Sequence, residues 1–320
     1  MLKIPNIPTA FRITRALVKR RPFPLALRCR LTYRCQANCS YCALPSKQMT
    51  ELSTQDWLTL FDQARRAGTA RVAFDGGEPL LRDDVRTLAE RVLGLGMVLS
   101  VNTNGLLVKD HLDWLTRVHV VKLSLDGGEE THERSRHGVP LEKVIEAAEL
   151  LRRKGATLNF AFTMTAQTLP SIDSALEIAA RVGASVVFQP VFQLRLAEDL
   201  SSLIPDPGLF REAVDHLIGI KRENPGLIRN SPAMLRRLRS WPDFPFKGCS
   251  AGRLFMVVEP DGNVVPCERK KDLSSVRWAP DFDFIEAMER TGGGFRCQGC
   301  GFLGVYRLTS LMRFIPMKAG

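Results

Sequence analysis

The chain has 320 residues, of which 45% are hydrophobic and 25% charged, and its formal net charge is +11. This composition can bury a large core and excludes a disordered or fibrous chain. No stretch approaches about eighteen consecutive apolar residues, and residues 1–23 carry prolines and arginines where a secretory signal has an apolar segment. We therefore expect a cytoplasmic protein.

Two clusters, residues 12–34 and 221–239, hold much of the positive charge. Such clusters attract nucleic acid or an anionic membrane surface, or they are simply solvated faces. With three tyrosines and no aromatic-rich basic strands, the sequence disfavours nucleic acid as a partner. Residues 4–18 mix apolar and basic side chains, which suits either peripheral contact with an anionic membrane or packing on the domain that follows.

Residues 25–31 alternate in polarity, which predicts a half-buried strand. Cys29 falls on its apolar side, and we expect it in the core and not among ligands. The strand runs directly into Leu31–Ser46, LTYRCQANCSYCALPS, which contains Cys35, Cys39 and Cys42.

Three cysteines spaced by four and three residues place three thiols in one short loop. A [4Fe–4S] cluster held by three thiolates keeps one iron open, and that iron can bind a cofactor and pass it an electron. The alternatives are three buried cysteines or three ligands of a structural zinc whose fourth ligand lies elsewhere. The tight clustering, with Tyr41 directly before the last cysteine, favours iron and sulfur.

The following chain alternates helices and strands. Ser53 and Asp56 form a capping-box start of a helix that Gly68 ends. Further strands are expected at residues 71–74, 97–101, 118–125, 157–163 and 185–192, with helices at 84–93, 109–115, 141–154 and 172–182. This pattern predicts an α/β fold with a parallel sheet, either doubly wound or a barrel, with the cysteine loop at the carboxyl end where active sites lie.

The second strand ends in FDGGEPLL, which contains Gly76, Gly77, Glu78 and Pro79. Two glycines allow close approach of the backbone to a ligand, and a carboxylate beside them can bind an ammonium group.

Short polar side chains also end the next two strands, among them Asn104, Ser124 and Asp126. They suit contacts with a polar ligand and are equally ordinary turn formers. The loop after Gly128 adds His132, Arg134, Arg136 and His137, which would either contact an anionic substrate or face solvent.

The last third of the chain contains Cys249, Cys267, Cys297 and Cys300. Residues 254–259 and 263–265 read as a β-hairpin, and a helix is expected near residues 283–290. Four cysteines form a complete site without an open position, so they suit a structural zinc or a fully ligated iron–sulfur cluster.

The CxxxCxYC loop followed by GGEP resembles the signature of the radical S-adenosylmethionine (radical SAM) superfamily. The resemblance implies a partial (β/α)6 TIM-like barrel, a [4Fe–4S] cluster on Cys35, Cys39 and Cys42, and an external reductant such as flavodoxin or ferredoxin. It also implies that S-adenosylmethionine contacts residues from the loop and the strand ends: Tyr41, Gly76, Gly77, Glu78, Pro79, Asn104, Ser124 and Asp126.

The spacing Cys249-x12-Gly262-x4-Cys267 resembles the opening of the SPASM and twitch extensions of this superfamily, which carry auxiliary [4Fe–4S] clusters. A full SPASM pattern continues with further cysteines, whereas none follows Cys300. The resemblance therefore favours a small β-hairpin and helix domain of twitch type, with one auxiliary [4Fe–4S] cluster in place of zinc.

The chain is thus expected to have five parts. They are a basic N-terminal segment (1–24), the partial barrel (25–195), a helical connecting segment (196–246), a twitch/SPASM-like iron–sulfur domain (247–303) and an apolar, basic tail (304–320).

The resemblance implies an enzyme that reductively cleaves S-adenosylmethionine to a 5′-deoxyadenosyl radical, which abstracts hydrogen from a peptide, small-molecule or lipid-like substrate. The auxiliary cluster would transfer electrons in this oxidoreductase or radical-type modifying reaction. No protein side chain is assigned as catalytic, because the cofactor radical performs the chemistry. The alternative is a non-catalytic, zinc-containing nucleic-acid-binding protein.

Overall fold

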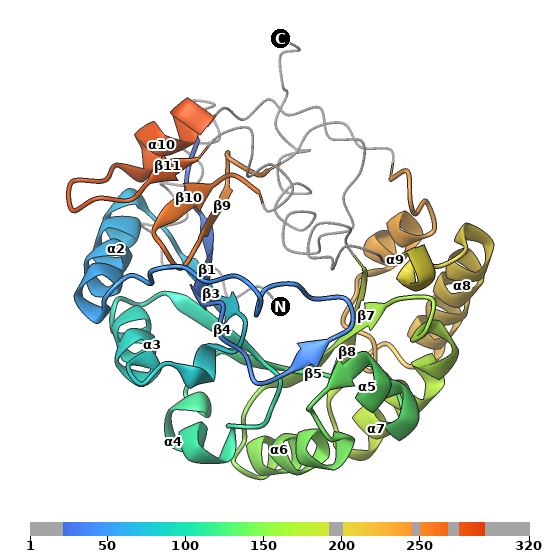
Figure 1. The fold of residues 1–320 in the computed structure, drawn as a ribbon. Helices are drawn as coiled ribbons and strands as arrows, with labels where there is room; N and C mark the ends of the chain where they lie inside the picture. Colours follow the sequence, from blue (N-terminus) through green and yellow to red (C-terminus); the bar gives the residue numbers. More distant parts are fainter. Residues whose placement is uncertain (1–21, 192–200, 245–249, 268–274, 292–320) are drawn as a thin grey trace.

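The computed structural model describes residues 22–191, 201–244, 250–267 and 275–291. The strands of its main sheet follow the order β11-β10-β9-β1-β3-β4-β5-β7-β8, and the helices surround the sheet on its outer side (Figure 1). In the described part of the chain the end strands β11 and β8 do not pair with each other, so the barrel is open.

Six parallel strands build the barrel and confirm the predicted α/β fold. They are β1 (Ala26–Thr32), β3 (Arg71–Gly76), β4 (Val98–Thr103), β5 (Val120–Ser124), β7 (Leu158–Met164) and β8 (Ser185–Pro190). Each pairs in parallel with the next one in this series. Their carboxyl ends therefore meet at one rim.

Helices connect these strands on the outside. They are α2 (Thr54–Ala67), α3 (Val85–Gly94), α4 (Leu112–Leu115), α6 (Leu141–Arg153) and α7 (Ile172–Arg181), with 3₁₀ turns η1 (Pro79–Leu81), η2 (Lys109–His111) and η3 (Leu169–Ser171). The predicted capping box is present, since Ser53 and Asp56 exchange hydrogen bonds, and Gly68 ends α2 at φ 108°. The expected helix at residues 109–115 is only η2 followed by the short α4.

The core lies between the sheet and the outer helices. Leu27, Cys29 and Leu31 point from β1 into it, and the rings of Phe61 and Phe74 stack with centroids 5.8 Å apart. Cys29 is completely buried, which confirms that it belongs to the core, and burial raises its pKa far above the ordinary value.

The opposite face of the sheet, which lines the barrel interior, is polar near the rim. Arg28 pairs with Asp75 through Nε at 2.7 Å, and the Asn102 amide donates to the same carboxylate at 2.8 Å. Charged groups that leave water in this way need partners, and neighbouring strands supply them.

The predicted hairpin near the C-terminus is part of the same sheet. β9 (Phe255–Val258) pairs in parallel with β1, and β10 (Asn263–Val265) pairs antiparallel with β9. The short β11 (Val276–Arg277) follows, and α10 (Phe284–Thr291) packs beside α2 (Figure 1). Two buried side chains stabilise the contact between β1 and β9, since Arg30 of β1 donates to Glu259, directly after β9, at 3.0 Å.

The connecting segment contains helices, as predicted: η5 (Ser201–Leu203), α8 (Pro207–Glu223) and α9 (Pro232–Leu238). The chain between the last two helices covers the free edge of β8. Ile228 forms a parallel bridge with Val186, and the buried Asn230 side chain bonds both the N–H and the C=O of Phe188 at 2.9 Å. These bonds satisfy backbone groups that an edge strand would otherwise expose.

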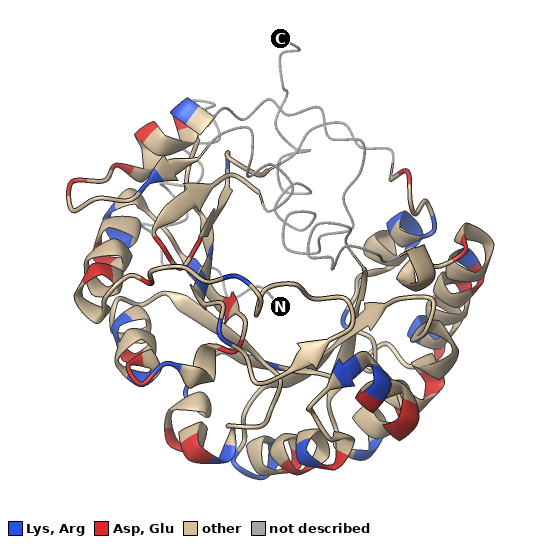
Figure 2. Cartoon of the chain, in the orientation of Figure 1, with Lys and Arg blue, Asp and Glu red and all other residues tan. Residues whose placement is uncertain are grey.

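The surface charges of the described residues are mixed in sign, with Lys and Arg alternating with Asp and Glu on the outer helices (Figure 2). Within the described ranges no helix is long and apolar enough to span a membrane. Residues 1–21, the tail at 304–320, and Cys249, Cys297 and Cys300 lie outside the described residues.

Candidate active site

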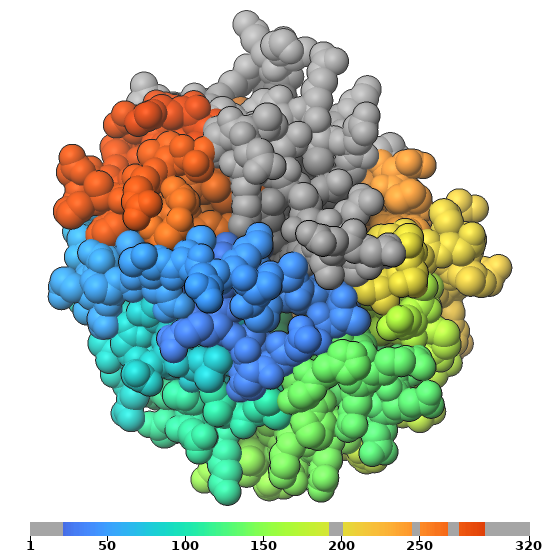
Figure 3. Space-filling model, in the orientation of Figure 1, coloured from blue at the N-terminus to red at the C-terminus, as the bar shows by residue number. Residues whose placement is uncertain are grey.

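The segment between β1 and α2 lies across the mouth of the barrel in Figures 1 and 3. It carries Cys35, Cys39 and Cys42, which are half-buried and form no disulfide. Burial raises the pKa of Cys39 to about 11, and the negative charges of Cys42 and Cys35 add to this effect. The three thiols are thus close enough for their thiolates to repel one another, and bound iron would remove that repulsion.

Hydrogen-bond donors lie near the sulfur atoms of Cys35 and Cys39. The Ala37 N–H lies 3.4 Å from the Cys35 sulfur, and the Asn104 amide lies 3.9 Å from it. Arg136 Nη1 lies 3.8 Å from the Cys39 sulfur. Donors and positive charge near the sulfurs stabilise thiolates and a cluster bound to them.

The donor set fits a cluster better than a single ion. Among the described residues no three His, Cys, Asp or Glu side chains are close enough to hold one metal ion. In a [4Fe–4S] cluster each thiolate binds a different iron, so the sulfurs stand farther apart than the ligands of one zinc. The charges of Cys35 and Cys42 act on Cys39, and among the described residues these three cysteines form no group that would hold a single ion.

Gly76 at the end of β3 and Gly77 directly after it have a role that the sequence did not indicate. A Cβ on Gly76 would clash with the carbonyl oxygen of Thr32, and one on Gly77 would clash with that of Arg34. The Gly77 N–H donates to the Thr32 carbonyl at 2.8 Å. The glycines therefore admit the backbone of the cysteine loop, while their predicted contact with a cofactor stays a prediction.

Glu78 joins the ends of two strands. Its carboxylate accepts from the backbone N–H of Asn104 at 2.7 Å and from that of Leu80 at 3.1 Å, and Pro79 follows it as the first residue of η1. Glu78 is completely buried, and burial raises its pKa to about 7 although these hydrogen bonds lower it. A carboxylate in this setting gains from a cation, so it fits the ammonium group that the sequence predicts there.

The strand ends at Asn104 and Ser124 lie on the same rim. The Asn104 side chain is buried and donates to Gln36 of the cysteine loop at 3.3 Å. Ser124 is half-buried at the end of β5, where it pairs with Ala161 of β7. Both positions lie beside the loop or on the barrel interior, which suits the contacts predicted for them.

Asp126 and Tyr41 lie deeper than the sequence suggested. The Asp126 carboxylate is completely buried and accepts from the Tyr41 hydroxyl at 2.6 Å and from the Thr163 N–H at 2.9 Å. Arg136 Nε lies 2.7 Å from it, and the Arg136 guanidinium lies over the Tyr41 ring. This geometry makes Asp126 an anchor for the middle of the cysteine loop, and its contact with a cofactor stays a prediction.

The segment after Gly128 is not the loop that the sequence predicted. It forms α5 (Glu129–Ser135) and β6 (Arg136–His137), and β6 pairs with β2 (Asn38–Cys39) inside the cysteine loop. His132 and Arg136 are buried, whereas Arg134 and His137 are exposed. Solvent exposure was therefore wrong for His132 and Arg136. The buried Asp126 carboxylate pairs with Arg136, and the Asp126 backbone N–H donates to the His132 ring.

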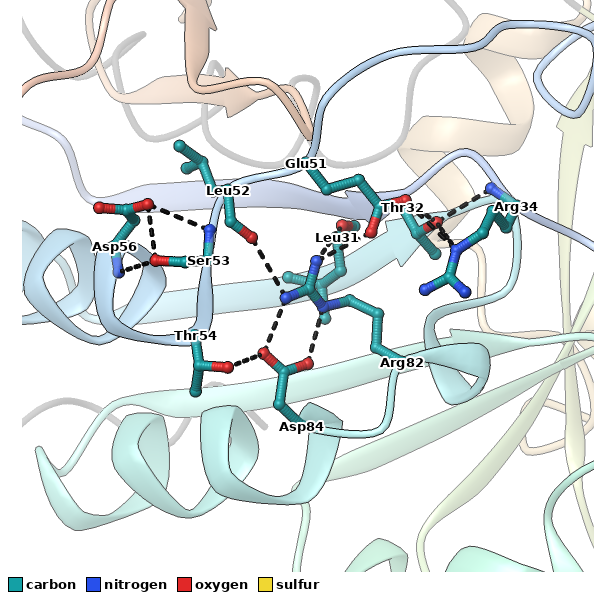
Figure 4. A network of polar contacts seen from close by, with 10 residues as sticks. All are labelled: Leu31, Thr32, Arg34, Glu51, Leu52, Ser53, Thr54, Asp56, Arg82 and Asp84. Atoms are coloured by element: carbon teal, nitrogen blue, oxygen red, sulfur yellow. Dashed lines mark hydrogen bonds and ion pairs between the residues drawn. The ribbon is translucent and has the colours of Figure 1, made fainter.

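Sequence reasoning also missed Arg82, a buried arginine below the cysteine loop (Figure 4). It belongs to the run GGEPLLRDD, and a basic residue between the apolar Pro79–Leu81 and two aspartates was the available signal.

Comparison with known proteins gives this site its context. Residues 29–179 match the model of the radical SAM superfamily. The fold is similar to that of SuiB from Streptococcus suis bound to S-adenosylmethionine, with a TM-score of 0.71 and 18% identity over 86% of this chain and 68% of that one. It is also similar to anSMEcpe with bound AdoMet and a Kp18Cys peptide, with a TM-score of 0.67 and 20% identity over 83% and 81% of the two chains.

Residues 29–179 of this chain therefore form a radical SAM domain, and that domain defines an enzyme. A [4Fe–4S] cluster and S-adenosylmethionine are the cofactors that the superfamily implies. The alternative of a non-catalytic zinc protein is set aside, since the domain is that of an enzyme.

Proposed function

We propose that this enzyme cleaves S-adenosylmethionine reductively at a cluster held by Cys35, Cys39 and Cys42, and that the resulting radical abstracts a hydrogen atom from a peptide. The observation that carries the proposal is the three-thiol loop across the barrel mouth, beside the strand ends that carry Glu78 and Asn104. A reduced cluster bound there would supply one electron to S-adenosylmethionine, whose carbon–sulfur bond would break to give methionine and a 5′-deoxyadenosyl radical.

The protein's own residues hold and shield the reacting groups. Three thiols bind the cluster, and Arg136 offsets negative charge near Cys39. Glu78 presents a buried carboxylate to the ammonium group of the methionyl part, where the loss of water strengthens the attraction. Because the loop covers the barrel mouth, it also limits the access of water to the radical.

A peptide substrate has two supports. SuiB has been solved with its precursor peptide SuiA, at a TM-score of 0.70 and 16% identity over 87% of this chain and 68% of that one, and anSMEcpe with a bound peptide. In addition, the rim half of the barrel interior carries Asp75, Asn102 and Gln189, which suit hydrogen bonding to peptide groups more than contact with a lipid tail. A small-molecule or lipid-like substrate is the competing outcome.

We further propose that Cys249, Cys267, Cys297 and Cys300 bind an auxiliary [4Fe–4S] cluster that accepts an electron during oxidation of the substrate. The support is their spacing around Gly262, together with the position of Cys267 directly after the β9–β10 hairpin. Metal and sulfide analysis of anaerobically purified protein tests this. About eight irons per chain support two clusters, whereas four irons and one zinc would remove the auxiliary cluster.

We also propose a reductant, a compartment and a membrane contact for this enzyme. Flavodoxin or ferredoxin would reduce the cluster in the cytoplasm, where reducing conditions preserve it. Contact of the basic segments with an anionic membrane is tested by flotation with anionic liposomes at physiological salt. Absence of binding would remove this part of the proposal.

The central experiment is anaerobic turnover with dithionite. Wild-type protein should form 5′-deoxyadenosine from S-adenosylmethionine, and replacement of Cys35, Cys39 and Cys42 by alanine should abolish it. Cys29→Ala is the matched control, because Cys29 is buried in the core, and this variant should keep its iron. Mass spectrometry of peptides that accumulate in a host carrying the triple variant would then identify the substrate. Failure of the reconstituted wild type to consume the cofactor would overturn the proposal.

A further inference from the structure

Arg82 lies below the cysteine loop with only 7% of its side chain exposed, and it is the centre of the network in Figure 4. A guanidinium has five N–H donors. Nε and Nη2 donate to the two oxygens of the Asp84 carboxylate at 2.8 and 2.7 Å. Nη1 donates to Glu51 at 3.0 Å and to the Leu31 carbonyl at 3.2 Å, and Nη2 also donates to the Leu52 carbonyl at 3.3 Å. All five donors are therefore used.

These partners lie at both ends of the loop that carries the cysteines. Leu31 is near the end of β1, directly before the loop leaves the sheet, and Glu51 and Leu52 are where the chain returns toward α2. A second contact closes the same gap, because the Thr32 hydroxyl donates to the other oxygen of Glu51. One buried guanidinium thus joins the two ends of the cysteine loop.

The geometry of β1 explains why the Leu31 carbonyl is available. The register between β1 and β3 shifts between Arg30 and Thr32, so Leu31 is the extra residue of a β-bulge. Bulges redirect a strand and leave a residue outside the ladder. The bulge therefore turns β1 into the cysteine loop, and Arg82 satisfies a carbonyl oxygen that the bulge exposes.

Arg82 also belongs to the turn that carries Glu78. It ends η1, with its own N–H bonded to the Pro79 carbonyl at 3.2 Å, and its partner Asp84 is the residue before α3. Asp84 in turn accepts from the Thr54 hydroxyl at the start of α2 at 2.7 Å. Arg82 with its partners Leu31, Glu51 and Asp84, here called the clamp, therefore links the cysteine loop to the turn at residues 76–79.

We propose that Arg82 is a positioning residue that fixes the cysteine loop relative to this turn, and thereby the cluster relative to the S-adenosylmethionine site. This inference rests on the proposed function only in that the cluster and its cofactor occupy those two places. Arg82 contacts neither of them itself, since its donors are all used by the chain. It acts through Leu31, Glu51 and Asp84.

The test compares Arg82→Met and Arg82→Lys with the wild type. An ammonium group has three donors and no fork, so lysine should restore part of the function that methionine loses. The matched control is Arg86→Met, one helical turn further along, because the Arg86 side chain is 56% exposed and pairs with Glu90 on the surface. Glu51→Gln weakens the clamp without adding an unpaired buried charge, and it keeps the test valid if Arg82→Met fails to fold.

Two readouts distinguish positioning from general stabilisation. The first is the rate of iron loss to a chelator under anaerobic conditions, which should rise about 10- to 100-fold in Arg82→Met, the range expected when a supporting group of a metal site is lost. The second is the change in the electron paramagnetic resonance spectrum of the reduced cluster on addition of S-adenosylmethionine. That change should shrink in Arg82→Met, recover in part in Arg82→Lys, and match the wild type in Arg86→Met.

The outcome that overturns the inference is a folded Arg82→Met or Glu51→Gln protein with the wild-type rate of iron loss and the wild-type spectral change, whatever its melting temperature. Only the signal that responds to S-adenosylmethionine is counted, so an auxiliary cluster does not interfere. If the wild type neither binds a cluster nor cleaves the cofactor, the proposed function fails and the role of Arg82 fails with it. A wild type that does both, beside variants that behave identically, overturns the role of Arg82 alone.

Discussion

At the scale of single residues, Asp126 decides how the middle of the cysteine loop is held. Its buried carboxylate accepts a hydrogen bond from the Tyr41 hydroxyl and forms an ion pair with Arg136. Arg136 also donates to the sulfur of Cys39. Removal of one member of a buried ion pair is costly, because the other charge stays in a medium of low polarity. Asp126 therefore stabilises the site from below.

Asp126→Asn should lower the free energy of unfolding by about 3–5 kcal/mol, because Arg136 is left buried without its counter-charge. Tyr41→Phe removes one hydrogen bond to a charged group and should cost about 1.5–3 kcal/mol. Urea unfolding of the apo protein measures both. Asp113→Asn is the control, since the exposed Asp113 pairs with the surface residue Arg86. Equal stability of the Asp126 and Asp113 variants would contradict the anchoring role.

Glu78 should make stability depend on pH. Burial raises its pKa in the folded protein from 4.5 to about 7, so the folded state holds this proton more tightly than the unfolded state. The resulting stabilisation is complete below about pH 4.5 and is lost as the pH rises through 7. Relative to Glu78→Gln, the wild-type apo protein should lose on the order of 1 kcal/mol per pH unit across this window. A difference between the two proteins that does not change with pH would contradict this prediction.

At the scale of elements, the cysteine loop is held by backbone contacts at three places. The bulge in β1 directs it out of the sheet, the glycine turn after β3 packs against its start, and β6 pairs with β2 near its middle. The loop contains little regular structure of its own, so these neighbours determine its path.

Gly77→Ala tests the contact with the glycine turn. The new Cβ would collide with the carbonyl of Arg34, so the loop must move, and overpacking of this kind costs about 1–3 kcal/mol. We expect a lower melting temperature and loss of bound iron. Gly94→Ala is the matched control, because nothing lies within 4 Å of a Cβ there and alanine favours the helix by about 0.5–1 kcal/mol. Full iron content in Gly77→Ala would show that the close approach is not needed.

At the scale of the whole molecule, the chain returns from α9 to place β9 beside β1. The hairpin that the sequence assigned to a separate C-terminal domain thus continues the barrel sheet, and Arg30 and Glu259 pair across the junction. β1 is therefore an inner strand with neighbours on both sides, and the cysteine loop emerges from the middle of the sheet.

A chain that ends at residue 244 should be less stable than the full chain and prone to aggregate. It would expose the edge of β1 and leave Arg30 without Glu259. Calorimetry and light scattering measure both effects, and the full chain should unfold in one transition that includes the hairpin. A truncated protein that stays monomeric with an unchanged melting temperature would show that the hairpin is independent of the barrel.

Much of this architecture follows from local patterns. The alternation of residues 25–31, the capping box at Ser53 and the recurring helices and strands identify the βα units, because each depends on neighbours a few residues away. The cysteine spacing and the GGEP turn likewise locate the candidate site. The barrel itself rests on family resemblance, since the same pattern also fits a doubly wound sheet.

The sequence by itself determined the order of the strands along the chain, the three-cysteine loop and the class of chemistry, since these depend on short-range spacing and residue type. Only the tertiary structure decided that Arg82 joins both ends of that loop, that Asp126 is buried beneath it, and that β9 lies beside β1. The physical reason is that these contacts join residues 31 to 229 positions apart, between groups whose burial and partners are set by packing and not by their neighbours in sequence.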